Sequence, residues 1–258
     1  MTQPETGGAN KETLPDFIII GAQKCGTMTL RHNLAQHSGV YMAQKEEWPV
    51  EEMHFFNNQE HWERGESWYR SHFSHPELLQ GEKTPDYLDN FTVHQRMHAT
   101  VPEARLIMLL RNPVDRAYSA WNHYNQDIEI TSSWGWEVIG FEQALERGMR
   151  YPQEIFVQLF VKGLYGPQID HLLQFYPREQ IHIVITERMH RAPEKEYQKV
   201  LAFLGLEAEE GVFKNHHMRG YTRPMHHETR TRLGRLFQPY NELLFKIVGE
   251  RIQEWEGG

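Results

Sequence analysis

A lysine lies between two glycines in the segment Gly21-Ala-Gln-Lys24-Cys-Gly26-Thr27, directly after a short apolar run. Glycines let a backbone turn sharply and approach an anion closely, and the unpaired amides of a helix N-terminus can face that anion. Lys24 adds a full positive charge to the same loop. This pattern predicts a binding site for phosphate or a similar anion. Considered alone, the segment is explained equally well as an ordinary strand-to-helix loop with a solvated lysine.

The order of residues in this loop differs from the Walker A loop of kinases and ATPases. In a Walker A loop the lysine follows the last glycine and precedes a serine or threonine that binds magnesium. Here Lys24 precedes Gly26, and Cys25 stands in the place of the hydroxyl residue. The sequence therefore argues against magnesium-dependent use of ATP.

A second candidate anion site lies between Arg105 and Ser119. Arg111 follows another apolar run, and Ser119 lies two turns into the helix that Pro113 should begin. An arginine fork beside a hydroxyl suits a terminal phosphate, which offers several acceptor oxygens. A salt bridge at the end of a strand is the alternative explanation for Arg111. We expect Arg116 to lie on the solvated face of the helix.

Three apolar runs are typical of buried parallel strands: Phe17–Ile20, Arg105–Leu110 and Ile181–Ile185. Each run is followed by a turn and a helical pattern, over 27–37, from 113 onward and over about 193–203. This alternation predicts an α/β fold, a single domain with a central parallel sheet flanked by helices. Ligands of such sheets bind at the carboxyl ends of the strands, where Lys24 and Arg111 lie.

The bulk composition fits one globular domain and excludes some functions. We expect the 258 residues to form a flexible N-terminal segment, 1–14, and one domain, 15–255. The formal net charge of −8 argues against nucleic-acid binding, which needs a basic surface. The sixteen histidines lack the spacing of metal ligands. Because no apolar run is long enough for a membrane span and no signal-peptide pattern occurs, we expect a cytoplasmic protein.

The two anion-binding segments resemble those of the sulfotransferase family, in the branch that includes heparan sulfate N- and 3-O-sulfotransferases and small bacterial sulfotransferases. The segment Gly21–Thr27 is similar to the family's 5′-phosphosulfate loop, and Leu110–Ser119 is similar to its 3′-phosphate motif. The resemblance covers about residues 15–255 and implies the P-loop-kinase-like sulfotransferase fold. Further segments similar to the family follow in family order: Glu52–Phe56, Gly81–Tyr87, Tyr165–Pro177 and Phe203–Gly205.

The resemblance implies a reaction and a set of catalytic residues. A sulfuryl group would pass from 3′-phosphoadenosine 5′-phosphosulfate (PAPS) to an acceptor hydroxyl or amine, with no metal required. Glu52 matches the family's base, and His54 would bond the acceptor or orient Glu52. Lys24 and Lys83 match lysines that contact the sulfonate and the bridging oxygen. Because a base works best near neutral pH, we expect partial burial to raise the pKa of Glu52.

From the residues alone, the glutamates at 46, 47, 51 and 52 are also consistent with a solvated acidic turn, and Glu51 is the alternative base. Two departures from the family pattern affect the donor site. Met28 stands where the family often has a second threonine or an arginine, so one phosphate contact is lost unless Thr29 supplies it. Near the C-terminus, only the segment from Arg219 to Arg223 is available to close over the donor. The residues expected to bind PAPS are Lys24, Cys25, Gly26, Thr27, Met28, Thr29, Arg111, Ser119, Arg219 and Gly220.

The sequence does not select one acceptor among sugars, phenols, polyketide hydroxyls and lipids, so we expect a small-molecule or carbohydrate acceptor. The negative net charge of the protein disfavours a long polyanionic chain as the acceptor, because such a chain needs an extended basic groove. The oligomeric state is not predicted. Two other functions remain as alternatives on the same scaffold: a nucleotide kinase, and a non-catalytic protein that binds nucleotides or glycans.

Overall fold

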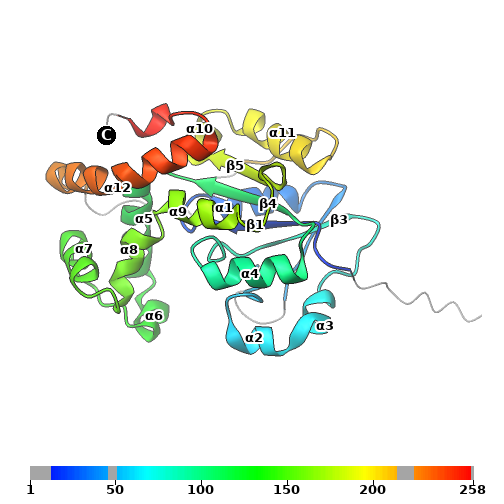
Figure 1. Cartoon of the computed structure of the whole chain (residues 1–258), viewed down its shortest axis with the longest axis horizontal. Coiled ribbons are helices and arrows are strands. Elements are labelled where there is room, and N and C mark those ends of the chain that lie inside the picture. Colours follow the sequence, from blue (N-terminus) through cyan, green and yellow to red (C-terminus); the bar gives the residue numbers. More distant parts are fainter. Residues whose placement is uncertain (1–12, 46–50, 214–223, 257–258) are drawn as a thin grey trace, which may run out of the picture.

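A five-stranded sheet forms the centre of the computed structural model, which describes residues 13–45, 51–213 and 224–256 (Figure 1). Within these residues the strands lie in the order β2-β3-β1-β4-β5, and every neighbouring pair is parallel. The predicted α/β fold with a central parallel sheet is therefore confirmed. The strands are β1 (Phe17–Gly21), β2 (Val40–Met42), β3 (Leu79–Lys83), β4 (Arg105–Leu110) and β5 (Ile181–Ile185).

Helices flank this sheet and connect its strands (Figure 1). No helix in the described parts of the chain is both long enough and apolar enough to cross a membrane. The helices are α1 (Thr27–Leu34), α2 (Gln59–Glu63), α3 (Gly65–Arg70), α4 (Phe91–Thr100), α5 (Pro113–Gln126), α6 (Ile128–Thr131), α7 (Phe141–Arg150), α8 (Gln158–Val161), α9 (Tyr165–Leu172), α10 (Thr186–Arg191), α11 (Pro193–Leu204) and α12 (His227–Val248).

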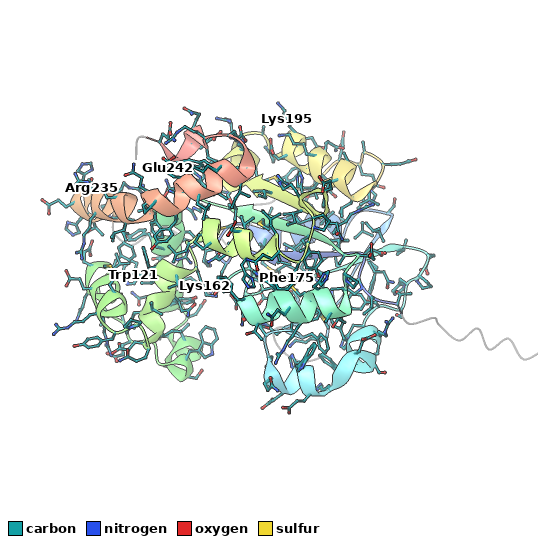
Figure 2. All side chains as sticks on the ribbon, viewed as in Figure 1. Trp121, Lys162, Phe175, Lys195, Arg235 and Glu242 are labelled. Carbon is teal, nitrogen blue, oxygen red and sulfur yellow. The ribbon has the colours of Figure 1, made fainter. Side chains whose placement is uncertain are left out.

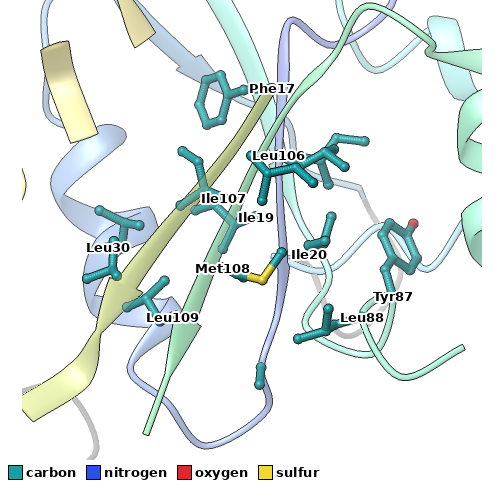
Figure 3. Close-up of a cluster of buried hydrophobic side chains, with 14 of the residues drawn as sticks. Phe17, Ile19, Ile20, Leu30, Tyr87, Leu88, Leu106, Ile107, Met108 and Leu109 are labelled. Carbon is teal, nitrogen blue, oxygen red and sulfur yellow. The ribbon is translucent and has the colours of Figure 1, made fainter. Parts of the chain in front are cut away.

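The core lies around β1 and β4, whose apolar residues are buried on both faces of the sheet. Figure 3 shows Ile19 of β1, Leu30 of α1 and Leu109 of β4 in one buried cluster. Removing this apolar surface from water is the main force that holds the sheet and its helices together. The neighbouring strand β3 comes so close that a Cβ atom on Gly81 would lie 2.2 Å from the ring of Phe17. Only glycine fits at this position of β3.

The helices that follow the predicted strands begin where the sequence indicates. α5 starts at Pro113, and the Asn112 side chain caps it by accepting the N–H of Val114 at 3.0 Å. α11 ends at Leu204, and Gly205 follows in the left-handed conformation with φ of 73°. α1 ends at Leu34, three residues earlier than expected. The loops that carry the candidate residues are therefore fixed at both ends by regular structure.

A second apolar cluster joins α5, α7, α8 and α12 beside the sheet. Arg116 of α5 lies between α5 and α8 and is fully buried, so the expectation of a solvated residue is wrong. Its Nη2 atom donates to the carbonyl oxygens of Gln158 at 3.2 Å and Leu159 at 2.5 Å. Because its Nε and Nη1 atoms are buried with no hydrogen-bond partner among the described residues, these two bonds offset only part of the cost of burying the guanidinium. Arg116 thus joins α5 to α8.

Candidate functional site

The loop that carries Lys24 connects β1 to α1 at the carboxyl edge of the sheet. Lys24 has φ of 68° and Gly26 has φ of 91°, so both residues adopt the left-handed conformation that favours glycine. α1 then begins at Thr27, with no side-chain cap from the described residues and no acid in its first turn. The first amides and the positive end of the helix dipole are suited to an anion.

Tyr165, the first residue of α9, links the two predicted anion sites. Its hydroxyl donates to the backbone carbonyl of Arg111 at 3.0 Å and lies 3.6 Å from Sγ of Cys25. The strands β1 and β4, which precede the two loops, are hydrogen-bonded neighbours. The structure thus brings the Lys24 loop and Arg111 together at one edge of the sheet.

Cys25 is fully buried beneath this edge. Burial raises the pKa of the Cys25 thiol, so the thiol is neutral and unsuited to nucleophilic chemistry. Its backbone carbonyl accepts the hydroxyl of Thr186 at 2.8 Å, which fixes the loop against the start of α10. The side chain of Cys25 therefore packs inside the protein, and its backbone shapes the loop.

The remaining residues of the predicted donor site lie on α1 and after β4. Arg111 follows β4 directly, and Ser119 lies two turns into α5, with both side chains partly exposed. The backbone N–H of Asn112 donates to the Glu187 carboxylate at 2.8 Å, which fixes the turn between Arg111 and α5. Thr29 is half-buried on α1. Arg219 and Gly220 lie outside the described residues.

Three predicted catalytic side chains meet at the carboxyl end of β3. Nζ of Lys83, the last residue of this strand, forms an ion pair with Oε1 of Glu52. The other carboxylate oxygen of Glu52 lies 2.9 Å from Nε2 of His54. Met28 of α1 completes the group, because its sulfur lies 2.9 Å from Nζ of Lys83. Glu52 is therefore an ion-paired residue of a site and not part of a solvated turn.

The segment that carries Glu52 and His54 is anchored by the apolar residues between and after them. Met53, Phe55 and Phe56 are buried, and the ring of Phe55 stacks on Tyr69 with centroids 4.3 Å apart. His54 has φ of 50°, a costly backbone conformation for a residue other than glycine. The packed aromatic rings hold the segment in this conformation.

The pKa of Glu52 contradicts the expectation from the sequence. Burial does push this pKa upward, but the hydrogen bond from His54 and the charge of Lys83 lower it to about 2. Burial lowers the pKa of Lys83 despite the nearby carboxylate. Burial would likewise lower the pKa of His54, but its hydrogen bond to Glu52 raises it. Glu52 is thus fully ionised at neutral pH and held between the side chains of Lys83 and His54.

Glu82, which precedes Lys83 on β3, is a buried carboxyl group that was not among the predicted site residues. Burial raises its pKa to about 7, although three hydroxyl groups donate to it. They belong to Tyr69 at 2.7 Å, Thr84 at 2.8 Å and Tyr87 at 3.3 Å. The period-two alternation of a strand would place Glu82 and Lys83 on opposite faces of β3, which is the signal that could have distinguished their roles.

In the described part of the chain, no group of three or more His, Cys, Asp or Glu side chains could hold a metal ion. The basic side chains at the site include those of Lys24, Lys83, His54 and Arg111. A carboxylate and four basic groups at one edge of a parallel sheet can bind an anionic ligand and accept a proton beside it.

Comparison with known proteins identifies the family. The family model for the sulfotransferase domain matches residues 14–237. Heparan sulfate glucosamine 3-O-sulfotransferase 5 of Mus musculus is 28% identical over 265 residues, which cover 93% of this chain and 74% of that protein. The chain spans only 20% of the bifunctional heparan sulfate N-deacetylase/N-sulfotransferase of Drosophila melanogaster, to which it is 27% identical over 215 residues.

Two solved structures support this assignment at different levels. The sulfotransferase from Alicyclobacillus acidocaldarius superposes with a TM-score of 0.77 and 27% identity, and the match covers 94% of this chain and 99% of that one. Mouse sulfotransferase SULT7A1 complexed with PAP has a TM-score of 0.50 and 15% identity over 86% of this chain and 62% of that one, a likeness of fold alone. Sequence and structure agree that the chain belongs to the sulfotransferase family and has the fold of a sulfotransferase.

Proposed function

We propose that this sulfotransferase takes its sulfuryl group from PAPS and transfers it to a hydroxyl or amine of the acceptor, with Glu52 as the base. The observation that carries the proposal is the contact of Glu52 with both Lys83 and His54 at the carboxyl end of β3. In this arrangement a proton acceptor lies beside a cation that can bind the transferred group or the leaving phosphate.

The two loops at the sheet edge fit the two phosphorylated ends of the donor. The uncapped start of α1 and Lys24 suit the 5′-phosphosulfate. Arg111 and Ser119 suit the 3′-phosphate, because a guanidinium and a hydroxyl both donate to phosphate oxygens. Tyr165 supports this division, because it contacts both loops and fixes the spacing between them. When the donor loses its sulfuryl group, adenosine 3′,5′-bisphosphate (PAP) is left as the second product.

In the proposed reaction, a bond forms between the acceptor oxygen or nitrogen and sulfur, while the bond from sulfur to the bridging phosphate oxygen breaks. Glu52 receives the proton that the acceptor loses, and His54 holds the carboxylate in position. Lys83 offsets the charge that develops on the leaving oxygen. A shift of Lys83 from Glu52 toward that oxygen would raise the pKa of Glu52, because the ammonium lowers it. Glu52 would then be a stronger base at the moment when the acceptor releases its proton than it is while paired with Lys83.

A transfer assay with PAPS labelled in its sulfuryl group tests this function. The full chain is incubated with labelled PAPS and a mixed library of sugars, phenols, amines and hydroxylated lipids, and products are identified by mass spectrometry. We expect sulfated products together with an equal amount of PAP. Phosphorylated products from ATP and magnesium, or tight binding of PAP without transfer to any acceptor, would contradict the proposal.

A further inference from the structure

A cavity of about 530 Å³ opens between the start of α4 and the end of α8. Figure 1 shows these two helices on opposite sides of the molecule's lower half, and Figure 2 shows Lys162 between them. The lining comes from three separate segments of the chain and is almost entirely polar. Five of its residues carry the inference: Asn57, Asp86, Asp89, Phe91 and Lys162.

Asn57 connects the cavity to the proposed base. Its side-chain oxygen lies 3.1 Å from Nδ1 of His54, and Nε2 of the same ring lies 2.9 Å from Glu52. The cavity wall and the carboxylate of Glu52 are therefore separated by a single imidazole ring. A molecule bound in the cavity is therefore separated from Glu52, the group that would accept a proton from the acceptor, by the ring of His54.

The charges of the wall do not suit an anionic acceptor. Nζ of Lys162 lies 2.6 Å from Asp86 and 3.3 Å from Asp89, so two carboxylates share one ammonium. Lys162 is buried, and its pKa is raised because the two carboxylates outweigh the effect of burial. The ammonium is thus committed to internal partners, and the formal charges of the three groups leave one negative charge in excess, although burial raises the pKa of Asp89. Sulfated or carboxylated molecules would be repelled from this wall.

The rim of the cavity offers one aromatic surface. Phe91 is 47% exposed, which is unusual for a phenylalanine, and its ring stacks on that of His171 with centroids 4.3 Å apart and an interplanar angle of 9°. Among the described residues that line the cavity, Phe91 is the sole apolar one. A largely apolar acceptor such as a lipid would leave the carboxylates and amides without partners, which is costly.

We propose that this cavity binds the acceptor and that the acceptor is an uncharged carbohydrate. The hydroxyl groups of a sugar donate to the oxygens of Asp86, Asp89 and Asn57, and the apolar C–H face of the ring packs on Phe91. This inference rests on the proposed function, because it identifies the cavity as the acceptor side of the Glu52 site. It differs from the heparan sulfate that names several relatives, which is a polyanion.

Binding measured without PAPS tests the inference separately from transfer. The full chain is applied to a glycan array that carries uncharged, carboxylated and sulfated oligosaccharides, and the dissociation constant of the best uncharged glycan is measured by calorimetry. We expect binding of uncharged glycans, weakened about tenfold by Asp86→Asn or Phe91→Ala. Glu103→Gln is the matched control on an exposed residue outside the cavity and should leave binding unchanged. Phe91→Ala keeps the test valid if Asp86→Asn impairs folding, because Phe91 is exposed.

Two results would overturn the inference: binding confined to sulfated or carboxylated glycans, or no uncharged glycan bound above the background of Phe91→Ala. Each of these leaves the proposed function intact if labelled sulfate still reaches an acceptor. Conversely, binding of uncharged glycans without any transfer from PAPS would support the cavity assignment and contradict the proposed function.

Discussion

The side-chain hydroxyl of Thr84 accepts the backbone N–H of His54 at 3.2 Å and donates to the buried carboxylate of Glu82 at 2.8 Å. Through this contact the interior of β3 supports the backbone of His54, which has a positive φ angle. His54 in turn contacts Glu52. The position of the proposed base therefore depends on a hydroxyl group that touches neither the base nor the proposed acceptor cavity.

Replacing Thr84 with valine should lower kcat while leaving the KM for PAPS nearly unchanged. Valine has the shape of threonine but cannot bond His54 or Glu82, and a lost hydrogen bond of this kind costs about 1–2 kcal/mol, or roughly five- to thirtyfold. Thr84→Ser, which keeps the hydroxyl, is the control and should restore most of the rate. Equal losses in both variants would show that packing, and not the hydroxyl, matters at this position.

Glu52→Gln should abolish proton acceptance and lower kcat by about 10²–10⁴-fold, the usual contribution of a positioned base. Because glutamine keeps the size of glutamate, the dissociation constant of PAP measured by calorimetry should change little. Glu51→Gln is the matched control at the neighbouring residue. Normal turnover by Glu52→Gln, or a loss of equal size in Glu51→Gln, would refute the assignment of the base.

Arg111→Ala should weaken PAP binding by about ten- to a hundredfold, because charged hydrogen bonds contribute about 1.5–3 kcal/mol each. Calorimetry with PAP measures this directly and needs no acceptor. Arg150→Ala, which removes an exposed arginine from the end of α7, should leave the dissociation constant unchanged. An unchanged constant for Arg111→Ala would remove this residue from the donor site.

The buried carboxyl group of Glu82 should make the protein less stable as the pH rises through neutrality. Its pKa is about 7 in the folded protein, against an ordinary value of 4.5. The folded state thus holds the proton more tightly than the unfolded state, so the stabilising effect is complete below pH 4.5 and is lost as the pH rises through 7. This difference between the two pKa values corresponds to roughly 3 kcal/mol in the free energy of unfolding.

Thermal unfolding between pH 5 and pH 8 tests this effect. The Tm of the wild-type protein should fall across this range by several degrees more than that of Glu82→Gln, which has no carboxyl group to ionise. The comparison separates Glu82 from His54, whose raised pKa acts in the same direction in both proteins. Parallel Tm curves for the two proteins would contradict the assigned pKa.

The sequence predicted the elements with strong apolar patterns and missed those in which charge is buried. β1, β4 and β5 are apolar throughout their buried positions and were recognised. β3 has the sequence Leu-Gln-Gly-Glu-Lys. It was not predicted because most of its residues are not apolar, although its last four positions are buried. β2 has only three residues, too few to show a period.

The same limit applies to single residues. Arginine is a residue type that is usually exposed at the surface. Arg116 is buried only because α5 packs against α8. The family resemblance supplied Glu52, His54 and Lys83, with His54 as a residue that bonds the acceptor or orients Glu52, but it did not supply the ion pair between Glu52 and Lys83. The pKa of Glu52 depends on two partners that are close in space, one of them thirty-one residues away along the chain. Sequence patterns do not report such distances.

The burial of Cys25 gives this chain an internal probe for motion of the donor loop. As the single cysteine of the sequence, it can react with an alkylating reagent only when the loop between β1 and α1 opens. The rate of alkylation therefore reports the frequency of that opening without any introduced label. If PAP bridges this loop and the one after β4, its addition should slow the reaction in proportion to occupancy.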